Sequence, residues 1–217
     1  MGGWVLGPFV IKADILYMLI SIVIGLIVFS SVSPFQKTQK KVLIDIVTTQ
    51  LFQLVIAIII GKIVLHLSLF VEDPIAVLAY PGDGNALYIG TMLVILYNGW
   101  KYQRTNQSWT LTLYTWSVVL LTSLFTFYFL QMTIGNHPQW LELLVSFVLL
   151  LGMIISTGKV PLSIVTYSSL ILWLFLQIIF YFFVNLTFYY YSPSIIFYSS
   201  LMLLLIAMYV MEKKKGM

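Results

Sequence analysis

The stretch that decides the fold is GKIVLHLSLFVEDPIAVLAYPGDGNALYIG, residues 61–90. It begins inside a long apolar run, breaks at Asp73-Pro74, and ends in a glycine-bearing loop that leads into the next apolar run. Lys62 and His66 are four positions apart, so on a helix they share one face. A lysine inside an apolar span is costly in hydrocarbon and is therefore a candidate functional residue. The alternative is that Lys62 extends to the lipid headgroups or forms a structural ion pair.

The composition around this stretch is that of a membrane protein. Of the 217 residues, 61% are hydrophobic and 8% are charged, and the mean hydropathy is +1.02. Soluble domains carry about a quarter charged residues, so we expect one polytopic membrane domain over residues 1–217. The chain has no cysteine, which excludes disulfides and thiolate chemistry. The net charge of +4 reports on topology and not on nucleic-acid binding, and no cleavable signal peptide is expected at the N-terminus.

Seven apolar runs predict an all-α bundle of about seven transmembrane helices. The third run is short for a bilayer span, and the sixth is long enough to tilt or to extend beyond the membrane. The predicted spans are Phe9–Val32, Val42–Phe70, Ala86–Tyr97, Trp109–Thr133, Gln139–Ser156, Pro161–Phe188 and Ile195–Met211.

Basic residues alternate between the predicted connections. The second, fourth and sixth connections contain no lysine or arginine, whereas the first, third and fifth connections and the C-terminal tail are basic. Because basic residues favour the cytoplasmic side, we expect the N-terminus outside and the C-terminus in the cytoplasm. The residues that carry this pattern are Lys37, Lys40, Lys41, Lys101, Arg104, Lys159, Lys213, Lys214 and Lys215.

With that topology, most of the polar residues of the predicted spans gather toward the outer side. A histidine near a carboxylate has the chemistry of a general base. The alternatives are that His66 is satisfied by backbone or water, and that His137 forms the turn before a helix. No metal-ligand spacing, P-loop or nucleophile elbow occurs, and no cofactor is expected. The outer group is Asp14, Lys62, His66, His137, Glu142 and Gln177, and the inner half of the second span holds Asp45, Gln50 and Gln53.

Several short motifs follow one another in a familiar order. The chain has LGPFVIK at Leu6–Lys12, Gly61-Lys62 in the second span, Asp73-Pro74 followed by the Gly82–Gly84 loop, and HPQWLE at His137–Glu142. In this order they resemble motifs of the bacterial prolipoprotein diacylglyceryl transferases, seven-span enzymes that move a diacylglyceryl group from phosphatidylglycerol to the lipobox cysteine of a lipoprotein precursor. The resemblance implies a location in the bacterial cytoplasmic membrane.

The chain departs from that family at the positions that carry its chemistry. The family's catalytic His-Gly-Gly corresponds to Leu87–Gly90, where Tyr88 is nearest to the histidine, and no arginine or glycine occurs within Trp116–Gln131. Gln177 stands where the family has an arginine, and Asp14 where it has a tyrosine. Glutamine cannot bind a phosphate through two parallel hydrogen bonds as arginine does. With the family's arginines replaced or missing, Lys62 is the cation within the predicted spans that remains to bind a phosphate.

The resemblance implies a lipid-handling protein on the outer face of the membrane, with phosphatidylglycerol-like phospholipid and lipoprotein precursors as partners. In a catalytic version, His66 or Tyr88 acts as acid or base and Lys62 contacts the phosphate or oxyanion. Asp14, His137, Glu142 and Gln177 then bind or position the substrate. One alternative is a non-catalytic pseudoenzyme or assembly partner. Another is a small-solute transporter that uses buried charges, although no repeat or broken helix pair is evident.

Overall fold

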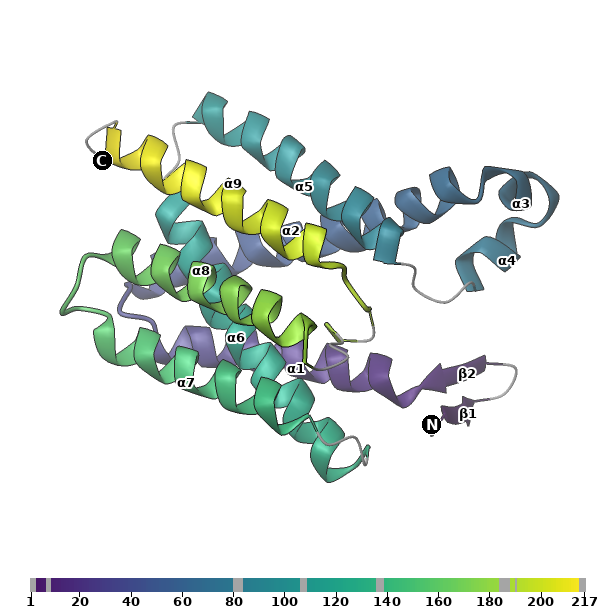
Figure 1. Cartoon of the computed structure of the whole chain (residues 1–217), viewed down its shortest axis with the longest axis horizontal. Helices are drawn as coiled ribbons and strands as arrows, with labels where there is room; N and C mark the ends of the chain where they lie inside the picture. The colour runs from purple at the N-terminus through teal and green to yellow at the C-terminus, as the bar shows by residue number, and fades with distance from the viewer. Residues whose placement is uncertain are drawn as a thin grey trace.

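The chain folds as a helical bundle, shown by a computed structural model that describes residues 3–6, 9–79, 84–105, 109–135, 139–183, 188–189 and 191–214 (Figure 1). The two ends of the chain lie at opposite ends of the bundle. The long helices are α1 (Ala13–Val32), α2 (Lys37–Leu65), α5 (Gly84–Thr105), α6 (Trp109–Thr133), α7 (Trp140–Ser156), α8 (Leu162–Tyr181) and α9 (Ile195–Lys214). The short elements are β1 (Gly3–Leu6), β2 (Phe9–Lys12), α3 (Leu67–Glu72) and α4 (Pro74–Ala79).

Five of these helices, α1, α2, α6, α8 and α9, are long and apolar enough to cross a membrane. Helix α7 is apolar but has 17 residues, and α5 has 22 residues with a polar C-terminal part. Each predicted apolar run overlaps one long helix, although α2, α5 and α9 extend beyond their runs, and the helical membrane architecture is confirmed in this coarser form. An unpredicted antiparallel hairpin, β1–β2, precedes α1, so the first helix begins at Ala13 and not at Phe9.

The boundaries of the helices differ from the predicted spans where the sequence did not show that a helix ends. Trp109–Thr133 matches α6, but the predicted span Val42–Phe70 is divided at His66, whose backbone (φ −121°, ψ 44°) ends α2. Asp73 has the extended conformation that a residue before proline prefers, and it separates α3 from α4. The α7–α8 connection turns at Gly158, whose φ of +87° suits a residue without a Cβ.

Helix α6 is the centre of the bundle. Fourteen of its 25 residues are buried, compared with three of 20 on α1, and it contacts α1, α2, α7 and α8. Its sequence has no glycine, proline or charged residue, so the backbone hydrogen bonds run without interruption. The hydroxyls of Thr115 and Ser117 donate to the carbonyls of Leu111 and Leu113, one turn back, at 2.9 and 2.7 Å. This local bonding satisfies polar groups that would be costly in a core within lipid.

Helices α2 and α5 form a close antiparallel pair through small residues. A Cβ atom added at Gly61 would lie 2.9 Å from the carbonyl oxygen of Ala86. One added at Gly90 would lie 2.9 Å from the backbone nitrogen of Ile58. Glycines of this kind let two membrane helices approach at backbone distance, which is a common means of association in lipid.

The helix directions separate the charges between the two ends of the bundle. Neighbouring helices run antiparallel, as the contacts of Asp14 with Gln131 and of Thr110 with Glu212 show. One end of the bundle therefore holds the starts of α1, α5, α7 and α9 and the ends of α2, α6 and α8 (Figure 1). We call this end, which carries Asp14, Glu72, Asp73 and Glu142, the acidic end. The opposite, basic end carries Lys37, Lys40, Lys41, Lys101, Lys159, Lys213 and Lys214.

Two glycines of α5 provide a test of the α2–α5 contact. We expect Gly90→Ala to lower the free energy of unfolding by roughly 1–3 kcal/mol, because its methyl group meets the backbone of Ile58. Gly99→Ala is the matched control, since nothing lies within 4 Å of its added Cβ and alanine favours the helix. Thermal unfolding of the detergent-solubilised protein measures both. Equal stability of the two variants would contradict the close contact.

Candidate functional site

A buried carboxylate at the acidic end is the centre of the candidate site. Glu142 lies in the first turn of α7 and is 5% exposed, and Gln177 on α8 donates from Nε2 to Glu142 Oε2 at 2.8 Å. The positive end of the α7 dipole favours a carboxylate at this position. The structure therefore brings together two of the predicted site residues, which are 35 positions apart in the chain.

The second oxygen of Glu142 faces an environment of tyrosines. Oε1 is buried and has no hydrogen-bond partner among the described residues. Tyr128 of α6 and Tyr198 of α9 are almost fully buried, and both lie near Glu142. Phenol groups both donate and accept hydrogen bonds, so they complement a carboxylate or the polar part of a bound molecule. A carboxylate inside a membrane protein with an acceptor to spare is a candidate binding group.

A chain of hydroxyl groups lies beside this cluster. Tyr189 and Ser123 are 2.6 Å apart at their oxygens, and Ser123 and Ser21 are 3.1 Å apart, which links α1, α6 and the segment before α9. Tyr189 has a φ of +55°, a value that side-chain-bearing residues adopt infrequently. Its ring packs against Phe127 and Phe188, with centroids 4.9 and 5.0 Å away. These contacts fix the segment that closes the acidic end.

Tyr88, predicted as a candidate acid or base, is used in packing. The backbone N–H of Ser194 donates to its hydroxyl oxygen at 2.5 Å, and its ring stacks on Phe197 with a centroid separation of 4.9 Å. Phe197 in turn packs on the ring of Tyr198 with a centroid separation of 5.8 Å, which connects Tyr88 to the Glu142 cluster. The structure thus places Tyr88 at the edge of the site, where it anchors the start of α9.

Lys62 and His66 lie on a different flank, at the C-terminal end of α2. Lys62 follows Gly61, the residue that packs against the first turns of α5, and its side chain is half-buried. His66 is the residue at which α2 ends, and its backbone N–H donates to the Lys62 carbonyl at 3.0 Å. The expectation that one helix carries both residues inside a span was wrong for His66, because the helix breaks there.

The length of α2 gives the depth of Lys62. Lys62 is 21 positions after Lys41, which lies at the basic end of α2. At about 1.5 Å per residue this is roughly 32 Å, close to the thickness of the hydrocarbon core of a bilayer. If Lys41 marks one boundary of the hydrocarbon, this length would place Lys62 near the opposite boundary.

The remaining predicted site residues have separate positions. Asp14 at the start of α1 accepts a hydrogen bond of 3.3 Å from Gln131 Nε2 of α6, so it links these two helices. His137 lies outside the described residues. The site as described therefore combines Glu142 and Gln177 with a set of tyrosines, while Asp14 and Lys62 lie on other helices at the same end.

An amide network joining α2, α5 and α6 was not predicted as a unit. Gln50 donates to Asn98 Oδ1 at 3.1 Å, Asn98 donates to Gln53 Oε1 at 3.1 Å, and the Trp116 indole donates to Gln50. Gln50 and Gln53 stood out in the sequence as polar residues within a span, but their partner Asn98 did not. Because these amides bond to one another, the network has a structural role and holds α2, α5 and α6 together.

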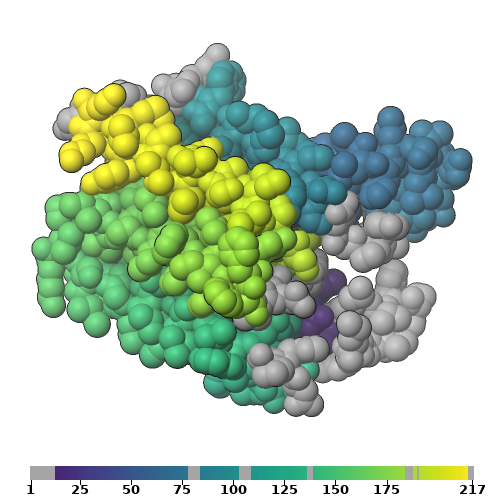
Figure 2. Space-filling view, viewed as in Figure 1, coloured from purple at the N-terminus to yellow at the C-terminus, as the bar shows by residue number. Residues whose placement is uncertain are grey.

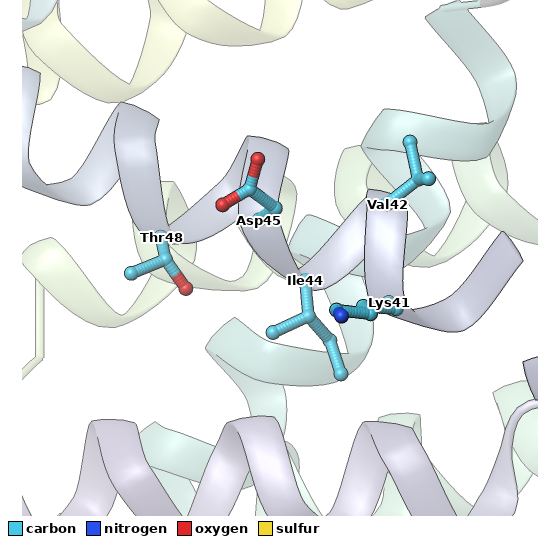
Figure 3. A pocket seen from close by; sticks show the side chains of 5 residues that line it. All are labelled: Lys41, Val42, Ile44, Asp45 and Thr48. Carbon is cyan, nitrogen blue, oxygen red and sulfur yellow. The ribbon is translucent and has the colours of Figure 1, made fainter. Parts of the chain in front are cut away.

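The basic end holds a shallow hollow beside α2, lined by Lys41, Val42, Ile44, Asp45 and Thr48 (Figure 3). All five residues come from one helix, and Lys41 and Asp45 are exposed. A surface formed by a single helix does not enclose a ligand. Among the described residues, no group of three or more histidine, aspartate or glutamate side chains is placed to hold a metal ion.

Comparison with protein-family models, with curated proteins and with solved structures gives no match. The fold and the site define a polytopic helical membrane protein with a buried carboxylate–tyrosine cluster at its acidic end.

The Glu142–Gln177 hydrogen bond predicts coupling between the two side chains. We expect Gln177→Leu to lower the free energy of unfolding by roughly 1–3 kcal/mol, because the buried carboxylate then loses its amide donor. The double variant Glu142→Leu/Gln177→Leu is expected to recover much of that loss, since neither polar group remains. A double-mutant cycle from unfolding in detergent measures the coupling. Additive effects would show that the pair is not coupled.

Proposed function

We propose that the protein handles phospholipid at the outer face of a bacterial cytoplasmic membrane, as a divergent relative of the diacylglyceryl transferases. The observation that carries the proposal is the depth of Lys62, roughly 32 Å from Lys41 along α2, at the level of lipid phosphates. An ammonium there compensates the charge of an anionic headgroup, and exposed apolar residues of α2 such as Val64 offer a surface to acyl chains.

The cluster around Glu142 supports the same proposal. It lies at the end of the bundle that also carries Lys62, and its buried carboxylate oxygen and phenols have the chemistry to bind hydroxyl or amine groups. In the proposed arrangement Lys62 contacts the phosphate, while Glu142 and Gln177 position the polar part of the substrate. In a transfer reaction, the cysteine sulfur of a lipoprotein precursor forms a bond to the glyceryl carbon. The carbon–oxygen bond to the phosphate breaks, glycerol phosphate leaves, and a base such as His66 accepts the thiol proton.

A second candidate function is a non-catalytic partner in lipoprotein handling. The observation that favours it is the position of Tyr88, whose hydroxyl accepts the Ser194 amide and whose ring stacks on Phe197. This residue stands where the related enzymes carry their catalytic histidine, and here it stabilises the contact between α5 and α9. In this version the acidic end binds lipid or a lipoprotein without a covalent step.

The proposal includes a topology of seven spans with the N-terminus outside. We expect Asp73→Cys, at the acidic end, to react with a membrane-impermeant maleimide on intact cells. Lys159→Cys, at the basic end, is expected to react only after permeabilisation. The natural chain has no cysteine, so each variant carries a single target. The reverse labelling pattern would contradict the proposed orientation.

Lipid retention tests the role of Lys62. We expect native mass spectrometry of the detergent-purified protein to show co-purified anionic phospholipid, and Lys62→Ala to lose most of it because the cation is gone. Lys62→Arg keeps a cation at the same depth and is expected to retain the lipid. Lys159→Ala, an exposed lysine at the basic end, is the matched control. Equal lipid in the Lys62→Ala and Lys159→Ala variants would refute the phosphate contact.

A further inference from the structure

Helices α3 and α4 form an arm, residues 67–79, that projects from the body of the protein at the acidic end (Figure 2). Hydrogen bonds and packing contacts stabilise the arm. Asp73 Oδ1 accepts the backbone N–H groups of Ile75 and Ala76 at 3.0 and 3.1 Å, which caps α4. Val77 is fully buried, and α4 contacts both α3 and the end of α2. The arm therefore has a defined surface to present.

That surface is apolar on one side. Leu67 and Val71, one turn apart on α3, are 60% and 78% exposed, and Ile75 on α4, beyond the break at Asp73, is 76% exposed. Ser68 and Glu72 occupy the neighbouring side of α3 and are also exposed. Large aliphatic side chains that lie together at such exposure mark a contact with another apolar phase.

An exposed apolar row on α2 leads toward the arm, from which it is separated by the end of α2 at His66. Phe52, Ile56, Ile60 and Val64 are exposed on the membrane-spanning part of α2 at intervals of four, and Leu67 follows three positions after Val64. Exposed aliphatic residues on a helix that crosses the bilayer face lipid. Since Lys62 lies near the headgroup boundary, the arm begins where the hydrocarbon ends.

We propose that the arm lies on the bilayer surface at the acidic end, with Leu67, Val71 and Ile75 inserted between phospholipid headgroups and the upper acyl chains. Its partner is the lipid leaflet itself. Glu72 and Asp73 then face water, which suits their charge. The arm fixes the depth of the adjoining end of α2 in the leaflet.

Site-directed spin labelling tests this placement in the full chain reconstituted in phosphatidylglycerol-containing vesicles. Val71→Cys on α3 and Ile75→Cys on α4 carry the label at the exposed apolar positions, and Glu72→Cys is the matched control on the same helix as Val71. Val64→Cys and Lys159→Cys provide lipid and water references. Because each labelled position is exposed, the variants are expected to fold as the unmodified chain does.

We expect the ratio of oxygen accessibility to nickel-chelate accessibility at Val71 and Ile75 to be several-fold higher than at Glu72, and close to the value at Val64. Ratios at Val71 and Ile75 equal to that at Lys159 would overturn the proposal, because the arm would then project into water. A protected label with low accessibility to both reagents would also overturn it, since a protein contact would then cover the arm.

Discussion

The structure depends on the requirement that every backbone polar group be bonded within the protein when no water is available. Helix α6 illustrates this requirement: it has no glycine, proline or charged residue, and the buried hydroxyls of Thr115 and Ser117 bond to its own carbonyls. It packs against α1, α2, α7 and α8, and of its buried hydroxyls that of Thr122 has no hydrogen-bond partner among the described residues. Because α6 fills the centre of the bundle, the outer helices can expose their aliphatic side chains to lipid.

Polar groups within the bundle fall into two kinds. The amides of Gln50, Gln53 and Asn98 bond to one another and to Trp116, which joins three helices and leaves little capacity for a ligand. Glu142 instead has one oxygen bonded to Gln177 and one without a hydrogen-bond partner among the described residues. The cost of burying such a carboxylate argues for a role in binding, since a purely structural role would be served by an apolar residue.

Lys62 and the Glu142 cluster lie at the same end of the bundle. This is the end at which we propose that a phospholipid headgroup binds. The hydroxyl of Tyr88 accepts the Ser194 amide, so this residue stabilises the contact between α5 and the start of α9. These positions make Lys62 and Glu142 the more informative residues for the proposed function, and Tyr88 the more informative residue for its non-catalytic alternative.

The sequence by itself determined the membrane class, one long helix in each apolar run, and candidates such as Glu142 and Gln177, because hydropathy and polar residues within spans are local properties. It did not reveal the break at His66, where no proline or glycine marks the end of α2. Only the tertiary structure decided that Gln177 bonds to Glu142, that Asn98 completes the amide network, and that Asp14 meets Gln131. The physical reason is that these partners lie 35 to 117 positions apart and meet only through the packing of antiparallel helices.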